Sequence, residues 1–213
     1  METPDTTAHF TSGWRQLLDH PPIYNFWQLI TGAEATKRKI IKAYCKPFMK
    51  AKILEIGCGT GTILKYIDKK IDVDYSGYDI NPKYINFARR KYGNRGNFYC
   101  ENVRQSSVRG ENFDMVLAIA IFHHLDDIES KKAITMAWEK LKINGLLILS
   151  EPVWTNQQSS IEKYLMTKDR GQNIRTEEKY IELVKTKFSN ISSYIVSDSH
   201  YIPWTVNIIT AEK

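Results

Sequence analysis

An apolar run, Ile53 to Ile56, breaks into the alternating glycines Gly57, Gly59 and Gly61 and then resumes as a pattern that predicts a helix. This arrangement is typical of a buried strand that ends in a tight turn around a nucleotide. Glycine is needed in such a turn because the chain adopts unusual dihedral angles and a ligand must approach the backbone. Glu55, near the strand end, is expected to point its carboxylate into the same crevice.

A second acidic residue closes the next apolar and aromatic run, which extends from Val73 to Asp79. Asp79 follows the glycine turn by about 20 residues, the spacing of a strand–helix–strand unit whose second strand offers a carboxylate to the hydroxyls of a ribose. The alternative is an ordinary glycine turn with a surface Asp after a strand. The compatible spacing of the two features argues for the nucleotide site.

The third glycine distinguishes between classes of nucleotide. Dinucleotide-binding turns have the pattern G-x-G-x-x-G, in which the last glycine permits close contact between helix and strand. Here Thr62 stands where that pattern needs glycine, which disfavours a nicotinamide-dependent dehydrogenase. The pattern from Glu55 to Gly61, E-x-G-x-G-x-G, resembles instead motif I of the class I S-adenosylmethionine-dependent methyltransferases.

The resemblance to this family continues to Pro152. Within the family, the chain resembles the group of small-molecule enzymes that methylate ubiquinone and menaquinone. Further matching segments are residues 97–103, 113–118, 122–125 (Phe-His-His-Leu) and 141–152. The family usually has Asp at the turn that contacts the adenine, where this chain has Asn102, whose carbonyl oxygen can still accept a hydrogen bond. A register shift of one would place Glu101 there. The resemblance implies S-adenosyl-L-methionine as cofactor, bound by Glu55, Gly57, Cys58, Gly59, Gly61, Asp79, Ile80, Asn102, Val103 and Ala118.

Strand-like and helical stretches alternate after residue 50, which predicts a parallel sheet with helices on both faces, a doubly wound Rossmann-like α/β fold. The expected strands are residues 51–56, 73–79, 97–101, 113–119, 146–150, 191–197 and 205–211. The resemblance implies a seven-stranded sheet, mostly parallel with one antiparallel strand from the final pair. We expect one domain, residues 49–213, preceded by a helical extension, residues 1–48.

His123 and His124 follow the fourth predicted strand, at the mouth of the expected pocket. Methyl transfer from a sulfonium is an in-line displacement in which the protein aligns the reacting atoms and excludes water, so no metal is required. An oxygen or nitrogen nucleophile must be unprotonated as it attacks, which needs a general base. We therefore predict both histidines as catalytic residues. The alternative is that the pair begins and caps a helix, with one imidazole bonded to the backbone.

Aromatic residues are frequent in the N-terminal extension, where Tyr24 and Trp27 are candidates for binding the acceptor. This segment either packs on the core or covers the cofactor or substrate as a lid. His200 lies in a second aromatic segment, which can line the acceptor pocket or simply connect two strands.

A cationic cluster supplies two more candidates for binding the acceptor, Arg170 and Arg175. Two arginines near a glycine can clamp a carboxylate or phosphate. The alternative is a solvated loop in which they pair with Asp169 and Glu177.

The net charge of +6 and the sequence pI of about 9.1 raise nucleic acid as a partner. The densest basic stretch, residues 37–52, has its charges at helical spacing between apolar residues. We favour the solvated face of an amphipathic helix over a phosphate-binding stripe.

The three cysteines, Cys45, Cys58 and Cys100, have no metal-like or redox-like spacing and suit a reducing cytoplasm. No signal-peptide pattern is present, and the longest uncharged apolar run, residues 115–122, is far too short to span a bilayer. We therefore expect a soluble cytoplasmic protein, and we make no prediction of its oligomeric state.

These observations predict a methyltransferase that acts on an oxygen or nitrogen of a small molecule. The basic N-terminal stretch motivates a second hypothesis, an RNA or protein methyltransferase. The chain after the fourth strand lacks the Asn-Pro-Pro-Tyr motif of many enzymes that methylate base amino groups. A third hypothesis is a catalytically silent protein that binds the cofactor within a larger complex.

Overall fold

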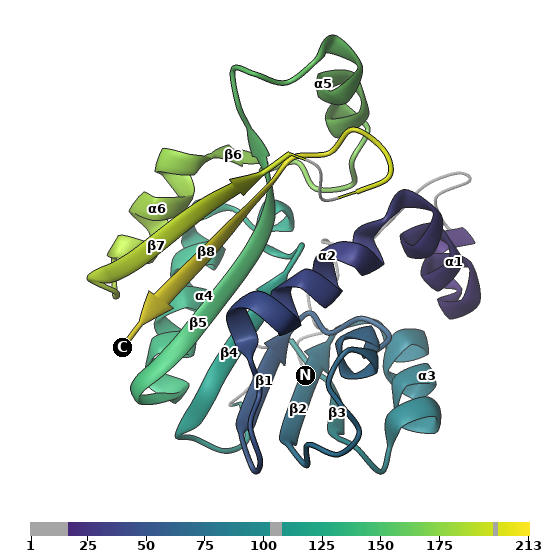
Figure 1. Ribbon diagram of the computed structural model, residues 1–213, viewed down its shortest axis with the longest axis vertical. Coiled ribbons are helices and arrows are strands. Elements are labelled where there is room, and N and C mark those ends of the chain that lie inside the picture. The colour runs from purple at the N-terminus through teal and green to yellow at the C-terminus, as the bar shows by residue number, and fades with distance from the viewer. Residues whose placement is uncertain (1–16, 103–107, 198–199) are drawn as a thin grey trace, which may run out of the picture.

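Parallel strands form the centre of the described part of the molecule. The computed structural model describes residues 17–102, 108–197 and 200–213 (Figure 1). The strands are β1 (Lys52–Ile56), β2 (Asp74–Asp79), β3 (Asn97–Cys100), β4 (Phe113–Ile119), β5 (Leu141–Trp154), β6 (Arg175–Thr176), β7 (Asn190–Val196) and β8 (Val206–Glu212).

The helices connect these strands. They are α1 (Pro21–Thr31), α2 (Ala33–Lys39), the π-helix η3 (Ile40–Cys45), α3 (Pro82–Tyr92), α4 (Asp127–Lys140), α5 (Ser160–Thr167) and α6 (Glu177–Lys185). Two short 3-10 turns, η4 (Thr62–Lys65) and η5 (Phe122–His124), follow β1 and β4. No described helix is long and apolar enough to cross a membrane.

The strand order is β3-β2-β1-β4-β5-β8-β7. Strand β8 runs antiparallel to both β5 and β7, and the other neighbours in this path pair in parallel. The predicted α/β sheet with one antiparallel strand is therefore confirmed. The sequence missed β6, a two-residue strand that pairs with β5 outside the main path.

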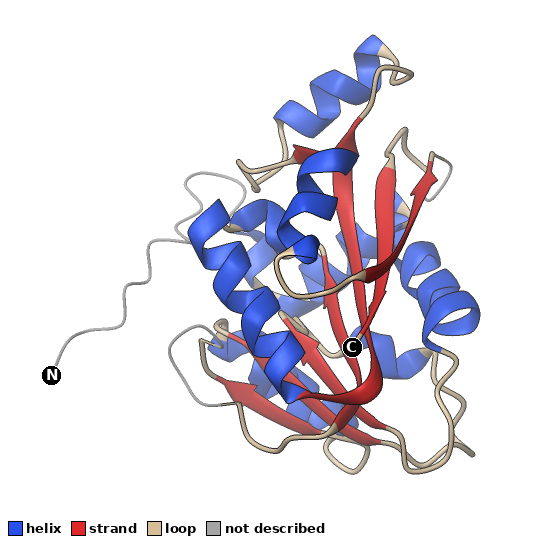
Figure 2. Cartoon of the chain, turned by 90° about the vertical axis from the view of Figure 1, so that its left-hand side faces the viewer, coloured by secondary structure: helices blue, strands red, loops and turns tan. Residues whose placement is uncertain are grey.

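Two apolar cores pack on the two faces of the sheet. One contains residues of η3, η4 and α3 together with Ile53 and Leu117, and the other contains residues of α4 and α6 together with Leu54 and Val116. Neighbouring strand residues thus point to opposite cores, as the alternation of a strand requires. Figure 2 shows helices on both sides of the strands.

The order of strands reverses between β1 and β4, because β1 continues to β2 on one side and β4 continues to β5 on the other. In open α/β sheets, ligands bind at the carboxyl ends of the strands beside such a reversal. The turns after β1, β2, β4 and β5 therefore meet where a ligand is expected.

Two local predictions differ from the structure. The helix expected after the glycine turn is only the 3-10 turn η4, which ends at Lys65. Strand β5 begins at Leu141, before the predicted strand 146–150, because Leu141 pairs with Phe113 ahead of a register irregularity.

The N-terminal extension enters the site through a bend between α1 and α2. Gly32 adopts a left-handed φ of 89° at this bend, and an added Cβ would lie 2.4 Å from the backbone nitrogen of Tyr201. The same nitrogen donates a hydrogen bond to the carbonyl of Thr31. The bend therefore touches the segment before β8, so two parts of the chain that are far apart in sequence lie side by side here.

Candidate functional site

The glycine turn and the predicted ribose-binding carboxylate are joined by hydrogen bonds. Gly57, Gly59 and Gly61 all have positive φ, at 69°, 54° and 72°. The Asp79 carboxylate accepts hydrogen bonds from the backbone N–H groups of Gly59 and Asn81, each at 2.8 Å. A carboxylate has about four acceptor positions, so Asp79 can also accept from a ligand.

The glycines differ in what they face. A Cβ on Gly57 would lie 1.9 Å from the Ile121 side chain, so this glycine permits packing of the chain after β4. At Gly59 the nearest atom to an added Cβ is in the Tyr24 ring, at 3.6 Å. The turn is therefore bounded on one side by the N-terminal extension.

Three contacts attach the N-terminal extension to this turn. Tyr24 stacks on Tyr84 of α3, with ring centroids 4.7 Å apart. Thr60 donates a hydrogen bond to Asn25 at 2.6 Å, and Lys37 donates to Thr62 at 2.7 Å. Residues of α1 and α2 thus lie against the glycine turn and the neighbouring helix α3.

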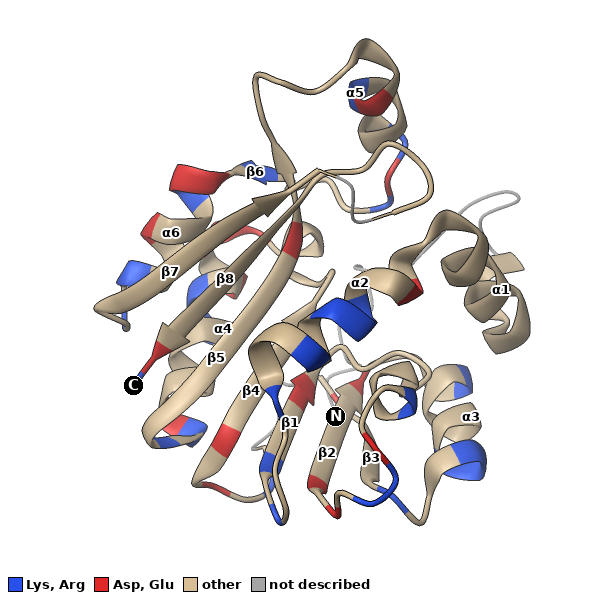
Figure 3. Ribbon diagram, in the orientation of Figure 1, with Lys and Arg blue, Asp and Glu red and all other residues tan. Residues whose placement is uncertain are grey.

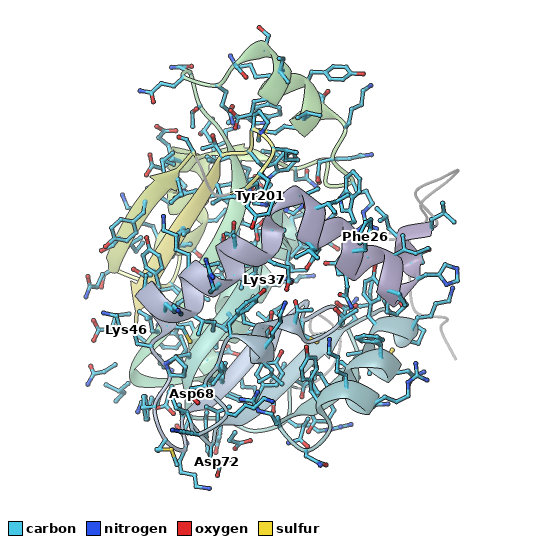
Figure 4. All side chains as sticks on the ribbon, turned by 45° about the vertical axis from the view of Figure 1, so that its right-hand side comes forward. Phe26, Lys37, Lys46, Asp68, Asp72 and Tyr201 are labelled. Carbon is cyan, nitrogen blue, oxygen red and sulfur yellow. The ribbon has the colours of Figure 1, made fainter. Side chains whose placement is uncertain are left out.

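The placement of Lys37 corrects the sequence prediction for the basic stretch. Only 12% of the Lys37 side chain is exposed, whereas Arg38 and Lys39 are exposed. Lys37 lies under α2 because that face of the helix packs toward the sheet (Figure 4). Figure 3 shows the other basic residues spread over several elements and interspersed with acids.

Two adjoining cavities lie beside the turn. The smaller, about 80 Å³, is lined by Lys37, Glu55, Gly57, Cys58 and Ile119 among others. The larger, about 410 Å³, is lined by Trp27, His123, His124, Asp169 and Arg170 among others. Both are lined by Tyr24, Gln28, Ala33, Ala120, Pro152, His200 and Trp204.

The structure places the predicted cofactor-binding residues in several different surroundings. Glu55, Gly57 and Cys58 line the smaller cavity, while Gly59, Gly61, Asp79 and Ile80 belong to the adjoining turns. Ala118 is fully buried in the core, and the next two residues, Ile119 and Ala120, line the cavity in its place. Asn102 follows β3, and Val103 lies outside the described residues.

The Glu55 carboxylate is buried and accepts a hydrogen bond from the hydroxyl of Tyr75. Burial raises the pKa of Glu55 to about 7, although the hydrogen bond and the charge of Lys37 act against this shift. Burial also raises the pKa of the Cys58 thiol well above its usual value. Both groups therefore favour their neutral, protonated forms more strongly in this cavity than they would in water.

His123 is buried between two carboxylates. Its Nδ1 lies 2.7 Å from Glu151 and its Nε2 lies 3.2 Å from Asp169. Burial alone would lower the pKa of His123, but the hydrogen bonds and charges of Asp169 and Glu151 raise it to about 9. The pKa of Asp169 is held at about 2, because the hydrogen bond and charge of His123 outweigh its own burial.

This arrangement divides the roles predicted for the histidine pair. A protonated imidazole with both nitrogens engaged is not suited to accept a proton, so His123 does not fit the predicted role of base. Glu151 also accepts hydrogen bonds from the backbone N–H groups of Ile121, Phe122 and His123. His124 also lines the larger cavity and lies beside His123, with ring centroids 4.1 Å apart.

The same cluster brings potential metal ligands together, although the sequence predicts no metal. One ligand atom each of His123, His124 and Asp169 lies within 4.8 Å of the others. The protonated His123 already supplies a positive charge to both carboxylates.

The predicted substrate-binding residues are split by the structure. Tyr24, Trp27, Arg170 and His200 line the larger cavity. Arg175 does not: its guanidinium donates to the carbonyls of Phe122 and Leu125 and to Asp127. Arg175 thus fixes the segment after β4, and its acidic partner is Asp127 rather than Asp169 or Glu177.

Sequence reasoning missed Lys37, Gln28, Ala120, Glu151 and Asp169. Glu151 carried a usable signal, since it is a charged residue near the carboxyl end of an apolar strand. Lys37 carried none, because its neighbours Arg38 and Lys39 are also basic and only packing distinguishes them.

Comparisons with known proteins agree with this geometry. A family model described as a methyltransferase domain matches residues 53–145. The phosphoethanolamine N-methyltransferase of Plasmodium falciparum is 25% identical over 171 residues, which cover 78% of this chain and 64% of that protein. The malonyl-[acyl-carrier protein] O-methyltransferase of Calditerrivibrio nitroreducens is 24% identical over 161 residues, 76% of this chain and 61% of that protein.

A solved structure supports the fold. Phosphoethanolamine N-methyltransferase 2 of Haemonchus contortus, in complex with phosphomonomethylethanolamine and S-adenosylhomocysteine, superposes with a TM-score of 0.74 at 14% identity. The match covers 95% of this chain and 60% of that chain. This chain thus spans less than two thirds of the length of these relatives. Their names do not support the ubiquinone and menaquinone subgroup.

Proposed function

Because this chain belongs to the class I S-adenosylmethionine-dependent methyltransferases, we propose that it transfers a methyl group to an oxygen or nitrogen atom of a small acceptor bound in the larger cavity. The observation that carries this proposal is that the two cavities adjoin, since Tyr24, Ala120 and His200 line both of them. One cavity adjoins the glycine turn and the other contains His124. A donor on one side and an acceptor on the other would meet near Ala120.

The residues of the turn fit S-adenosylmethionine, which supplies an electrophilic methyl group when bound. Asp79, at the end of β2, is positioned to accept hydrogen bonds from ribose hydroxyls. Glu55 and Lys37 offer opposite charges to an amino-acid end. The glycine turn presents its backbone between these groups.

His124 is the residue best placed to receive the proton of the acceptor. As the new carbon–oxygen or carbon–nitrogen bond forms, the carbon–sulfur bond breaks and its electron pair stays on sulfur, while the acceptor's proton passes to His124. Tyr24, Trp27 and Gln28 of α1 line the cavities and would exclude water from the reacting atoms, which favours in-line displacement.

The larger cavity favours a small acceptor with a negatively charged group. Its volume of about 410 Å³ lies within the range of small-molecule sites. Arg170 and Lys168 line it and can pair with a phosphate or carboxylate. Phosphoethanolamine is the first acceptor to test, because the Plasmodium falciparum relative is named for it.

Calorimetry with S-adenosylhomocysteine, followed by mass spectrometry of products from phosphoethanolamine and malonyl-[acyl-carrier protein], tests the proposal. We expect micromolar binding of the nucleoside and transfer to an amine or hydroxyl. Asp79→Asn should weaken binding by about tenfold or more through the loss of charge-assisted hydrogen bonds. A folded wild-type protein that does not bind the nucleoside would overturn the proposal.

A further inference from the structure

The segment 168–173 connects α5 to β6 and carries positive charge to the larger cavity. Lys168 and Arg170 both line this cavity, with Asp169 between them. The segment is neither helix nor strand, so no regular ladder of backbone hydrogen bonds fixes its path. Its contacts with other parts of the molecule therefore decide where the two cations stand.

His123 contacts this segment through both its side chain and its backbone. The Nε2 atom of His123 lies 3.2 Å from Oδ1 of Asp169, and the same oxygen accepts a hydrogen bond from the N–H group of Gly171 at 2.6 Å. The carbonyl of His123 accepts a hydrogen bond from the N–H group of Asn173 at 2.9 Å. One residue thus holds the segment at two points.

Gly171 lies directly against the imidazole. A Cβ at this position would lie 1.9 Å from Cδ2 of His123 and 2.7 Å from the carbonyl oxygen of His123. Gly171 does not have a positive φ. The close approach, rather than the backbone conformation, therefore requires glycine here. The segment is seated on His123 without space for one methyl group.

His123 is itself fixed on its other side. Its Nδ1 lies 2.7 Å from Glu151 of β5, and only 4% of the His123 side chain is exposed. Glu151 also accepts hydrogen bonds from the backbone N–H groups of Ile121, Phe122 and His123. His123 therefore links the end of a central strand to the 168–173 segment.

Arg170 extends from this segment toward Tyr24 of α1 and Tyr84 of α3. Burial raises the pKa of both phenols, and the nearby charge of Arg170 opposes both shifts. Tyr24 lines both cavities. A displacement of the segment would therefore move the guanidinium relative to the place where an acceptor would bind.

We propose that His123 is a positioning residue, which seats the 168–173 segment so that the Arg170 guanidinium can pair with a phosphate group of the acceptor. This inference rests on the proposed function, since it assumes that the larger cavity binds the acceptor. Arg170 and Lys168 together supply positive charge that matches the roughly double negative charge of a phosphate monoester. His123 then acts on the acceptor through Arg170 and not as a base.

Calorimetry of the protein saturated with S-adenosylhomocysteine, with phosphoethanolamine as the ligand, tests this role. Gly171→Ala should weaken phosphoethanolamine binding by about 10- to 100-fold, because the added methyl group displaces the segment from His123 and a hydrogen bond between charged groups is lost. The affinity for S-adenosylhomocysteine should change by less than about threefold. Gln172→Ala, at an exposed position of the same segment, is the matched control and should leave both affinities within about threefold of the wild type.

His123→Gln gives a second variant in case Gly171→Ala folds poorly, and it should produce the same selective loss. Arg170→Met separates positioning from a merely structural role, because a residue that acts through Arg170 adds no further loss once Arg170 is removed. The double variant of His123→Gln and Arg170→Met should therefore bind phosphoethanolamine within about threefold of Arg170→Met alone.

Additive losses in the double variant, or unchanged phosphoethanolamine affinity in both Gly171→Ala and His123→Gln, would overturn the role of His123 and leave the proposed function standing. A wild-type protein that binds S-adenosylhomocysteine but not phosphoethanolamine would also overturn this inference alone, since the cavity would then not accept the phosphate. A wild-type protein that binds neither ligand would overturn both proposals.

Discussion

Two adjacent histidines have different surroundings, and these surroundings assign them different chemistry. His123 is held between Glu151 and Asp169, whereas His124 also lines the larger cavity. His124→Gln should lower kcat for an oxygen or nitrogen acceptor by about 10²- to 10⁴-fold, the usual contribution of a general base. The affinity for S-adenosylhomocysteine, measured by calorimetry, should stay within about threefold of the wild type.

The pH profile separates a base from a residue that only shapes the cavity. If His124 removes the proton, the residual activity of His124→Gln should rise with pH as the acceptor loses its proton to hydroxide. Equal fractional activity of wild type and variant at every pH would contradict this role.

Arg175 lies in a cationic cluster that predicts acceptor binding, but its contacts in the structure are with the protein itself. It is 7% exposed and donates to carbonyls of Phe122 and Leu125 as well as to Asp127. Arg175→Met should lower the free energy of unfolding by about 3–5 kcal/mol. The buried carbonyl groups would lose their hydrogen-bond donor, and β6, which contains Arg175, would lose its attachment to the segment after β4. Urea denaturation measures this change, with the exposed Arg90→Met as control. A loss below about 1 kcal/mol would contradict the structural role.

The sequence predicted those residues whose type is required by the backbone conformation. It did not predict the roles of residues whose position depends on packing between distant segments. Gly57, Gly59 and Asp79 are recognisable because a tight turn and its acidic partner have a fixed spacing. Arg170 and Arg175 were indistinguishable in sequence. Only the fold directs one into the cavity and the other into the carbonyls after β4.

At the scale of elements, α1 is attached to the glycine turn by few polar contacts. Its apolar side chains Phe26, Leu29 and Ile30 are exposed at 62%, 53% and 46%, so packing of this face contributes little to its position. The hydrogen bond from Thr60 to Asn25 lies on the covered side. The attachment of α1 should therefore depend on this bond.

Asn25→Ala should accelerate hydrogen exchange of the α1 amides by about fivefold, corresponding to a net loss of about 1 kcal/mol. Amides of β4 should be unaffected and serve as the internal reference. Thr60→Val removes the other partner and should have the same effect, while the double variant should exceed neither single variant appreciably. Additive effects of the two changes in exchange mass spectrometry would show that the bond does not hold α1.

Elements with strong local signals were predicted closely. Strand β4 has the predicted bounds, because a continuous apolar run marks it. Strand β6 could not be predicted, since its two residues pair only after β5 is in place. The short η4 was also missed, because its length is set by packing against α3 and the sheet rather than by its own pattern.

For the whole molecule, the alternation of strands and helices was enough to predict the doubly wound sheet and its antiparallel strand. The way in which the N-terminal extension and the segment before β8 close over the carboxyl ends was not predictable. These contacts join residues far apart in the chain, such as Thr31 and Tyr201, and no periodic pattern encodes them.

The site contains a buried histidine, His123, and a half-buried one, His200, in opposite electrostatic surroundings, which predicts a pH dependence of stability for the whole chain. Burial lowers the pKa of His200 to about 4, so its contribution is lost as pH falls from about 6.5 toward 4. The pKa of His123 is raised to about 9, so its contribution is complete below about pH 6.5 and is lost as pH rises through 9.

The melting temperature, measured by circular dichroism from pH 4.5 to 9.5, should therefore respond differently to two substitutions. His200→Gln should flatten the acidic side of the profile, and His123→Gln should flatten its alkaline side. In each case the melting temperature should change by about 2–4 °C for every kcal/mol of stability that the histidine contributes. His20→Gln, at an exposed histidine, is the matched control. Since the two groups lie in different parts of the site, the double variant should combine both effects. Profiles that keep the wild-type shape in both single variants would show that neither imidazole is linked to folding.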